Sequence, residues 1–124
     1  MKKSILTIAG LGLAFFFAAC GTTQKSVAIP GTSEHHTGLA IDIVPKVDGE
    51  WKWENEDMMN LPELFAIIHK ELPKHGFILR YPKNKEETTG YSYEPWHIRY
   101  VASKKIAQKI FDEGITLEKY KGEK

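Results

Sequence analysis

Two short segments contain the side chains of this sequence that are best suited to chemistry. The first is SEHHTGLAID, residues 33–42, in which two adjacent histidines precede an aspartate that lies inside an apolar run. The second is EPWH, residues 94–97, in which a glutamate and a histidine are three residues apart. A carboxylate buried in a strand must be paired or must bind a metal ion. We therefore expect a site to form around Asp42.

Together, the two segments supply the ligands of an open zinc site. Two histidines and one carboxylate leave the fourth position of zinc to water, and a carboxylate that is not a ligand can accept a proton from that water. Neighbouring residues in an extended segment point to opposite sides, so only one of His35 and His36 should face Asp42. Glu94 and His97 complete the set. The alternative is a group of polar loop and strand residues without a metal, because isolated spacings of this kind are weak motifs.

The order and spacing of both segments resemble the zinc-dependent D-alanyl-D-alanine carboxypeptidases of peptidoglycan. The resemblance rests on Ser33-x-His35-x-x-Gly38-x-Ala40-x-Asp42, followed by Glu94-Pro95-Trp96-His97-x-Arg99-Tyr100-Val101. Residues 76–82, GFILRYP, also look like the strand that separates the two motifs in this family. The family includes both L,D-carboxypeptidases and the vancomycin-resistance D,D-carboxypeptidases. The resemblance extends from Gly31 to about Tyr120.

The resemblance implies a role for each matching side chain. It makes His35, Asp42 and His97 the zinc ligands, with Gly38 permitting the turn between the first two. It makes Glu94 the base that activates a water molecule and then passes a proton to the leaving amine.

Residues beside this set are given further roles. The resemblance implies that Ser33 helps to hold the terminal carboxylate of the substrate. Arg99, on the same strand face as His97, is expected either to form a structural ion pair, which is the more conservative interpretation, or to contact the substrate. Arg80 is expected to pair or to stack. His36 stands where the family commonly has glutamine, and a neutral histidine can form similar hydrogen bonds.

Three strands are expected to position the two motifs. Residues 39–44 alternate two sets of side chains and end at a proline, residues 77–81 form an apolar run, and residues 91–101 form a third strand. Residues 46–57 are charged, contain Asp-Gly, and are expected to form a loop or hairpin. Its two tryptophans, Trp51 and Trp53, are expected to pack on the sheet, the alternative being that they cover the rim of the site.

Helical periodicity and capping residues predict two main helices. Asn60 is expected to cap the first, which has a proline in its first turn and stops between Pro73 and Gly76. Ser103 is expected to cap the second, which ends at Gly114. Its inward residues are predicted to be Ile106, Ala107, Ile110 and Phe111. Residues 116–120 add a further turn, and His69 and His75 are expected at the surface.

The predicted order of elements is strand, helix, strand, strand, helix. This order favours a small α+β domain with a mainly antiparallel sheet. Combined with the family resemblance, it implies a hedgehog/D,D-peptidase-like fold in which helices flank the sheet around a zinc site.

The N-terminal residues predict a secretory signal. MKKSILTIAGLGLAFFFAAC begins with two lysines and continues with an apolar segment shorter than the ~20 residues that a spanning helix needs. Its end resembles a bacterial lipoprotein signal in which Cys20 is lipidated. We therefore expect residues 1–19 to be a lipoprotein signal peptide, residues 20–30 a tether, and residues 31–124 the zinc carboxypeptidase domain. The alternatives are an uncleaved membrane anchor and a soluble secreted protein with one thiol.

Composition limits the partners and the stabilising devices of the chain. Its 17 basic and 16 acidic residues are nearly balanced, and they stay so if residues 1–19 are removed, which argues against nucleic acid as a partner. The chain has one cysteine and hence no internal disulfide. A bound metal would help to stabilise so small a core. We expect a monomer.

Two functions follow from these expectations. The first is a lipid-anchored, zinc-dependent carboxypeptidase of the cell envelope that removes C-terminal D-alanine from peptidoglycan stem peptides. The second is a non-enzymatic zinc module that binds cell wall or a protein partner. Hedgehog-type signalling domains, which share this zinc scaffold without needing the peptidase reaction, are a precedent for it. Glu94 favours the enzyme. Family members usually carry a longer N-terminal part with an arginine that binds the substrate carboxylate. No arginine precedes Arg80 here, which implies a shortened domain and favours the second function.

Overall fold

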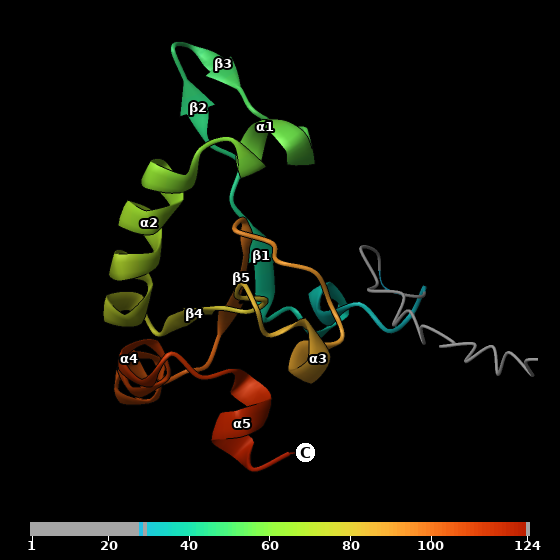
Figure 1. Ribbon diagram of the computed structural model, residues 1–124, viewed down its shortest axis with the longest axis vertical. Coiled ribbons are helices and arrows are strands. Elements are labelled where there is room, and N and C mark those ends of the chain that lie inside the picture. Colours follow the sequence, from blue (N-terminus) through green and yellow to red (C-terminus); the bar gives the residue numbers. More distant parts are fainter. Residues whose placement is uncertain (1–27, 29, 124) are drawn as a thin grey trace, which may run out of the picture.

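The centre of the molecule is an antiparallel sheet of three short strands. The computed structural model describes residue 28 and residues 30–123. The strand order is β1-β5-β4, with β1 at Ala40–Asp42, β5 at His97–Tyr100 and β4 at Phe77–Leu79. Asp42 is the pairing partner of His97, so the sheet itself joins the two sequence motifs (Figure 1). The predicted α+β class with an antiparallel sheet is confirmed.

The strands are shorter than predicted, most of all the third. Only His97–Tyr100 of the expected residues 91–101 is strand. Pro95 is fully buried and has no N–H to donate to a ladder. The preceding residues turn instead, because the Glu94 N–H donates to the carbonyl of Tyr81 and the His97 N–H to the carbonyl of Glu94. This turn aims Glu94 and His97 at the same side.

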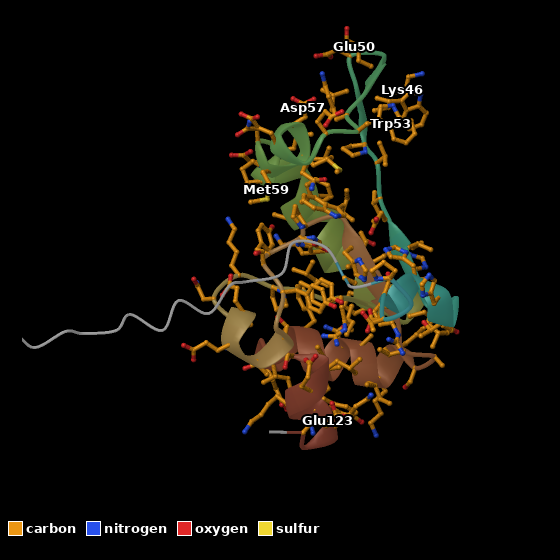
Figure 2. All side chains as sticks on the ribbon, turned by 90° about the vertical axis from the view of Figure 1, so that its right-hand side faces the viewer. Lys46, Glu50, Trp53, Asp57, Met59 and Glu123 are labelled. Carbon is orange, nitrogen blue, oxygen red and sulfur yellow. The ribbon has the colours of Figure 1, made fainter. Side chains whose placement is uncertain are left out.

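Residues 46–51 form the hairpin that was one of the predicted alternatives. Strands β2 (Lys46–Val47) and β3 (Glu50–Trp51) pair with each other and are joined by Asp48 and Gly49. The φ angles of these two residues, 50° and 85°, are both positive, as in the type I′ turn of hairpins with a two-residue loop. The hairpin projects from the body of the protein, and Figure 2 shows Glu50 at its tip, at the opposite end from Glu123.

The tryptophans of this hairpin do not pack on the sheet, contrary to prediction. Trp51 and Trp53 are 53% and 65% exposed, and their ring centroids are 5.9 Å apart. The side chains lie against each other because the hairpin extends past the end of the three-stranded sheet, where no sheet face is available to cover them (Figure 1).

Two helices and a 3-10 turn follow the hairpin. They are α1 (Asn55–Met59), α2 (Pro62–Glu71) and η2 (Leu72–His75). Asn60 ends α1, and the N-cap position of α2 is Leu61, which makes no side-chain cap. The predicted cap at Asn60 was wrong because α1 was not foreseen. Phe65 is only 1% exposed and packs with Met58 and Trp96.

The C-terminal helices form a second core with the sheet. Helix α4 (Lys104–Glu113) is capped by Ser103, whose hydroxyl accepts from the Ile106 N–H, and it ends at Gly114, as predicted. Helices α3 (Glu86–Thr89) and α5 (Leu117–Lys121) are short, and α5 confirms the further turn. This core contains Ile78, Ala107, Ile110 and Leu117. Phe111, predicted to point inward, is 44% exposed.

His69 lies on the inner side of α2 and not at the surface as predicted. Its Nε2 donates a hydrogen bond to the carbonyl oxygen of Pro95 at 2.9 Å. Burial lowers the pKa of this imidazole, against the opposing effect of the Pro95 carbonyl. The contact connects α2 with the turn that carries Glu94. His75, by contrast, is exposed as expected.

Across residue 28 and residues 30–123, no helix is both long and apolar enough to cross a membrane. The predicted signal peptide, most of the tether and Cys20 lie outside the described residues.

Candidate metal centre

Local backbone geometry brings His35 to the strand that carries Asp42. Residues Glu34–Thr37 form a 3-10 turn, η1, which begins where the Ser33 hydroxyl accepts from the His35 N–H at 3.3 Å. Gly38 then adopts a φ of 70°, a left-handed conformation that glycine reaches without strain. The chain reverses there and enters β1. The turn thus folds His35 back toward Asp42.

Three side chains converge in an arrangement that could hold a metal ion. His35 Nε2 lies 3.4 Å from Asp42 Oδ1, and His97 Nδ1 lies 3.3 Å from the same oxygen. One ligand atom from each residue lies within 4.8 Å of the others. His97 is buried, whereas His35 and Asp42 are exposed. The neighbouring His36 is also exposed. Of the two adjacent histidines, the structure places His35 in the group.

The contact between His97 and Asp42 shifts the pKa values of both side chains, in opposite directions. Burial alone would lower the pKa of His97, but hydrogen bonds with Asp42 and Glu34 outweigh burial and raise it to about 9. Burial would raise the pKa of Asp42, but the hydrogen bond with His97 and the charge of His35 lower it. The carboxylate is therefore ionised at neutral pH, as a metal ligand must be.

Glu94 lies beside this group. Its Oε2 is 3.6 Å from His97 Nδ1, and its side chain is 14% exposed. Burial raises the pKa of Glu94, the negative charge of Asp42 adds to that effect, and His97 opposes it. A partly buried carboxyl group with a raised pKa next to a possible metal site is typical of a general acid or base.

Glu34 is the site residue that the sequence interpretation missed. Its Oε1 accepts from Arg80 Nε and from Arg99 Nη1, both at 2.6 Å, and its Oε2 accepts from His97 Nε2 at 3.3 Å. Burial alone would raise the pKa of Glu34, but the hydrogen bonds from His97 and Arg80 outweigh it and lower the pKa to about 2. The available signal was its place between two assigned residues, Ser33 and His35.

The two arginines near the site are both engaged in ion pairs. Arg80 Nη2 lies 2.6 Å from Glu118 Oε1, and its guanidinium also lies over the ring of Tyr81. It therefore both pairs and stacks, the two alternatives expected from the sequence. Arg99 pairs with Glu34 and also donates to the carbonyl of Tyr100. Of its two predicted roles, the structural ion pair is the one formed here.

A pocket of about 260 Å³ opens onto the converging side chains. The predicted residues Ser33, His35, Asp42, Glu94 and His97 all line it. The lining also contains Ala28, Glu34, Asn55, Tyr81, Tyr91 and Trp96. Arg99 lines a different hollow, together with Tyr100 and Leu117. The three possible ligands and Glu94 therefore share one opening.

A family model and curated protein sequences that match this chain point to the same family. A model of the VanY family, described as D-alanyl-D-alanine carboxypeptidase, matches residues 18–103. VanXYC of Enterococcus gallinarum, a bifunctional D-Ala-D-Ala dipeptidase and D-Ala-D-Ala carboxypeptidase, is 43% identical over 102 residues, which cover 79% of this chain and 50% of that protein. The chain spans 34% and 50% of the lengths of two curated relatives that it matches.

Solved structures agree with the sequence comparison. The LdcB LD-carboxypeptidase shares 45% identity at a TM-score of 0.65, over 79% of this chain and 44% of the LdcB chain. The vancomycin resistance D,D-pentapeptidase VanY, solved in complex with Zn(II), shares 45% identity at a TM-score of 0.59, over 76% of this chain and 47% of that one. The resemblance predicted from the two motifs is thereby confirmed, and the chain belongs to the VanY family of D-alanyl-D-alanine carboxypeptidases.

Proposed function

We propose that this protein is a zinc-dependent carboxypeptidase that removes C-terminal D-alanine from peptidoglycan stem peptides. The observation that carries the proposal is the convergence of His35 Nε2 and His97 Nδ1 on Asp42, with the partly buried carboxyl group of Glu94 beside them. Similarity to a Zn(II)-bound D,D-pentapeptidase and membership of the VanY family support both the metal and the substrate class.

The donor set fits zinc. Two imidazole nitrogens and one carboxylate oxygen are ligands that Zn²⁺ accepts, and three protein ligands leave a position open, as in catalytic zinc sites. One carboxylate leaves a net positive charge at the site when the ion is bound. Bound zinc would supply a Lewis acid for the scissile carbonyl and would lower the pKa of a coordinated water molecule.

Glu94 carries out the proton transfers in this proposal. Its carboxylate accepts a proton as water attacks the carbonyl carbon, and the same carboxyl group then protonates the amine of the departing D-alanine. A raised pKa suits both steps, because a general base works best when its pKa lies nearer the operating pH. The turn before β5 holds Glu94 next to His97, so the base stays close to the ligand group.

Ser33 is our proposed contact for the terminal carboxylate of the substrate. It lines the pocket at the start of η1, beside His35. Arg99 is the second candidate that the sequence offers. Its direct use would require its guanidinium to share or to break the 2.6 Å ion pair with Glu34. A hydrogen bond from a neutral hydroxyl contributes about 1 kcal/mol net, against about 1.5–3 kcal/mol for a charged one, so Ser33 by itself should add only modestly to substrate binding.

The proposal is tested with defined stem peptides. The zinc-loaded protein should release alanine, detected by mass spectrometry, from peptides that end in D-alanine with a free carboxylate. The same peptides with an amidated C-terminus are the matched control and should release none. Ser33→Ala should raise KM and keep the zinc, and so should Arg99→Lys if Arg99 contacts the substrate. If the fully zinc-loaded protein releases no alanine from any peptide, the proposed enzymatic function is contradicted and a binding module is favoured.

We further propose that the protein is a monomer anchored in the cell envelope by a lipid on Cys20. The support is the basic start, the apolar segment and the Ala-Ala-Cys sequence of residues 1–20. Growth of an expressing bacterium with an alkyne-tagged fatty acid should label the wild-type protein, and Cys20→Ser should remove the label. A label that persists in Cys20→Ser would contradict the anchor. Light scattering of the protein without residues 1–19 should give the mass of one chain.

A further inference from the structure

We propose that Glu34 is a positioning residue of the metal centre and that helix α5 secures it through Arg80. In this proposal Glu34 orients the ring of His97 so that Nδ1 faces Asp42, while Glu118 of α5 holds Arg80 in place against Glu34. The inference rests on the proposed zinc site. It goes beyond that site because it assigns a role to residues that are not ligands and do not touch the reacting atoms.

The first step concerns the two nitrogens of His97. A neutral imidazole has one N–H donor and one acceptor nitrogen, and only the acceptor nitrogen can bind a metal ion. Nε2 of His97 faces Glu34 Oε2 at 3.3 Å, and Nδ1 faces Asp42 and Glu94 at 3.3 and 3.6 Å. An ionised glutamate can only accept a hydrogen bond. If Nδ1 binds a metal ion through its lone pair, the remaining ring N–H is on Nε2, where Glu34 would accept it and hold the ring with Nδ1 turned toward Asp42.

The second step concerns what holds Glu34 itself. Its two carboxylate oxygens have separate partners, because Arg80 and Arg99 both donate to Oε1 and His97 uses Oε2. The side chains of Glu34, Arg80 and Arg99 are only 13%, 12% and 17% exposed. A buried carboxylate must be paired with opposite charge. The two guanidinium groups thus fix the position of the Glu34 carboxylate and prevent it from turning away from His97.

The third step connects this group to the end of the fold. Arg80 has one guanidinium nitrogen on Glu34 Oε1 and another on Glu118 Oε1, each at 2.6 Å. Glu118 lies on α5, whose Leu117 belongs to the core formed with α4 and β4. A continuous series of contacts therefore leads from the C-terminal core through Glu118, Arg80 and Glu34 to His97. The packing of α5 should influence how firmly the metal is held.

Partners of this kind typically change metal affinity by 10–100-fold, because they orient the ligand and raise its basicity. We therefore expect Glu34→Gln to weaken zinc binding by 10–100-fold, measured by competition with a chromophoric chelator. In the zinc-loaded wild type, the His97 Nε2 proton should be visible by long-range ¹H–¹⁵N NMR as a hydrogen-bonded signal, and this signal should shift or vanish in the variant. Glu118→Gln should give a smaller loss of affinity in the same direction.

Glu71→Gln is the matched control, since Glu71 is an exposed glutamate paired with Lys74 on the surface, away from this network. It should leave both readouts unchanged. Glu34→Gln that binds zinc like the wild type and keeps the Nε2 signal would overturn the proposal. If Glu34→Gln does not fold, the decision falls to Glu118→Gln, and a folded Glu118→Gln protein with wild-type zinc affinity would overturn it equally.

These readouts are separate from turnover. A wild-type protein that binds zinc but releases no alanine would contradict the proposed function and leave the Glu34 experiment fully readable. A wild type that binds no zinc would overturn both proposals. An active wild type whose Glu34→Gln variant keeps normal affinity would overturn only the positioning role.

Discussion

Glu94→Gln should lower the turnover of a stem peptide by about a hundredfold or more while the zinc stays bound. Glutamine keeps the size and shape of the side chain but cannot accept a proton from the attacking water. The 3.6 Å contact places Glu94 beside His97 without making it one of the three converging ligands. Steady-state kinetics on peptides with a free terminal D-alanine, together with metal analysis of the same sample, measures both quantities.

An exposed glutamate provides the control for this experiment. Glu87 lies on the short helix α3 and is exposed, so Glu87→Gln should keep both turnover and zinc. Loss of zinc from Glu94→Gln would make Glu94 a ligand and would contradict the division of roles proposed above. Turnover within a few fold of the wild type would show that another group takes the proton.

His97→Ala should abolish zinc binding. His97 is the buried member of the ligand group, and strand pairing with β1 holds it beside Asp42. Its removal leaves one histidine and one carboxylate, too few protein ligands for a catalytic zinc site. Elemental analysis should show the zinc content falling from about one ion per chain to a small fraction of that value. Turnover should fall to background with it.

The stability of the protein should change in parallel. A ligand present at about 100 times its Kd stabilises the folded state by about 2.7 kcal/mol, and a domain of this size gains roughly 4–8 °C in Tm per kcal/mol. A chelator should therefore lower the Tm of the wild type by on the order of ten degrees and leave that of His97→Ala unchanged. His36→Ala is the matched control from the same turn as His35 and should keep its zinc. Zinc retained in His97→Ala would refute the ligand assignment.

Several local elements could be predicted from the sequence alone. The hairpin at Asp48-Gly49, the helix that begins after Ser103 and ends at Gly114, and the strand that carries Asp42 all occur where expected. Each depends on backbone preferences and on hydrogen bonds between residues a few positions apart, and such interactions are the same in most folds. The residues of the candidate site were chosen for a different reason: their types suit a metal site, and the resemblance of the two motifs to a known family implied a role for each of them.

The tertiary structure decided the features that depend on residues far apart in the chain. The ion pair between Arg99 and Glu34 follows from the β1-β5-β4 order, which places β5 next to the turn that precedes β1. The same order brings Arg80 to Glu34, and the packing of α5 brings Glu118 to Arg80. Trp51 and Trp53 stay exposed because the hairpin extends past the sheet. Burial and ion pairing depend on the position of every other element, so the two sequence motifs indicated the candidate ligands but not the network of ion pairs around them.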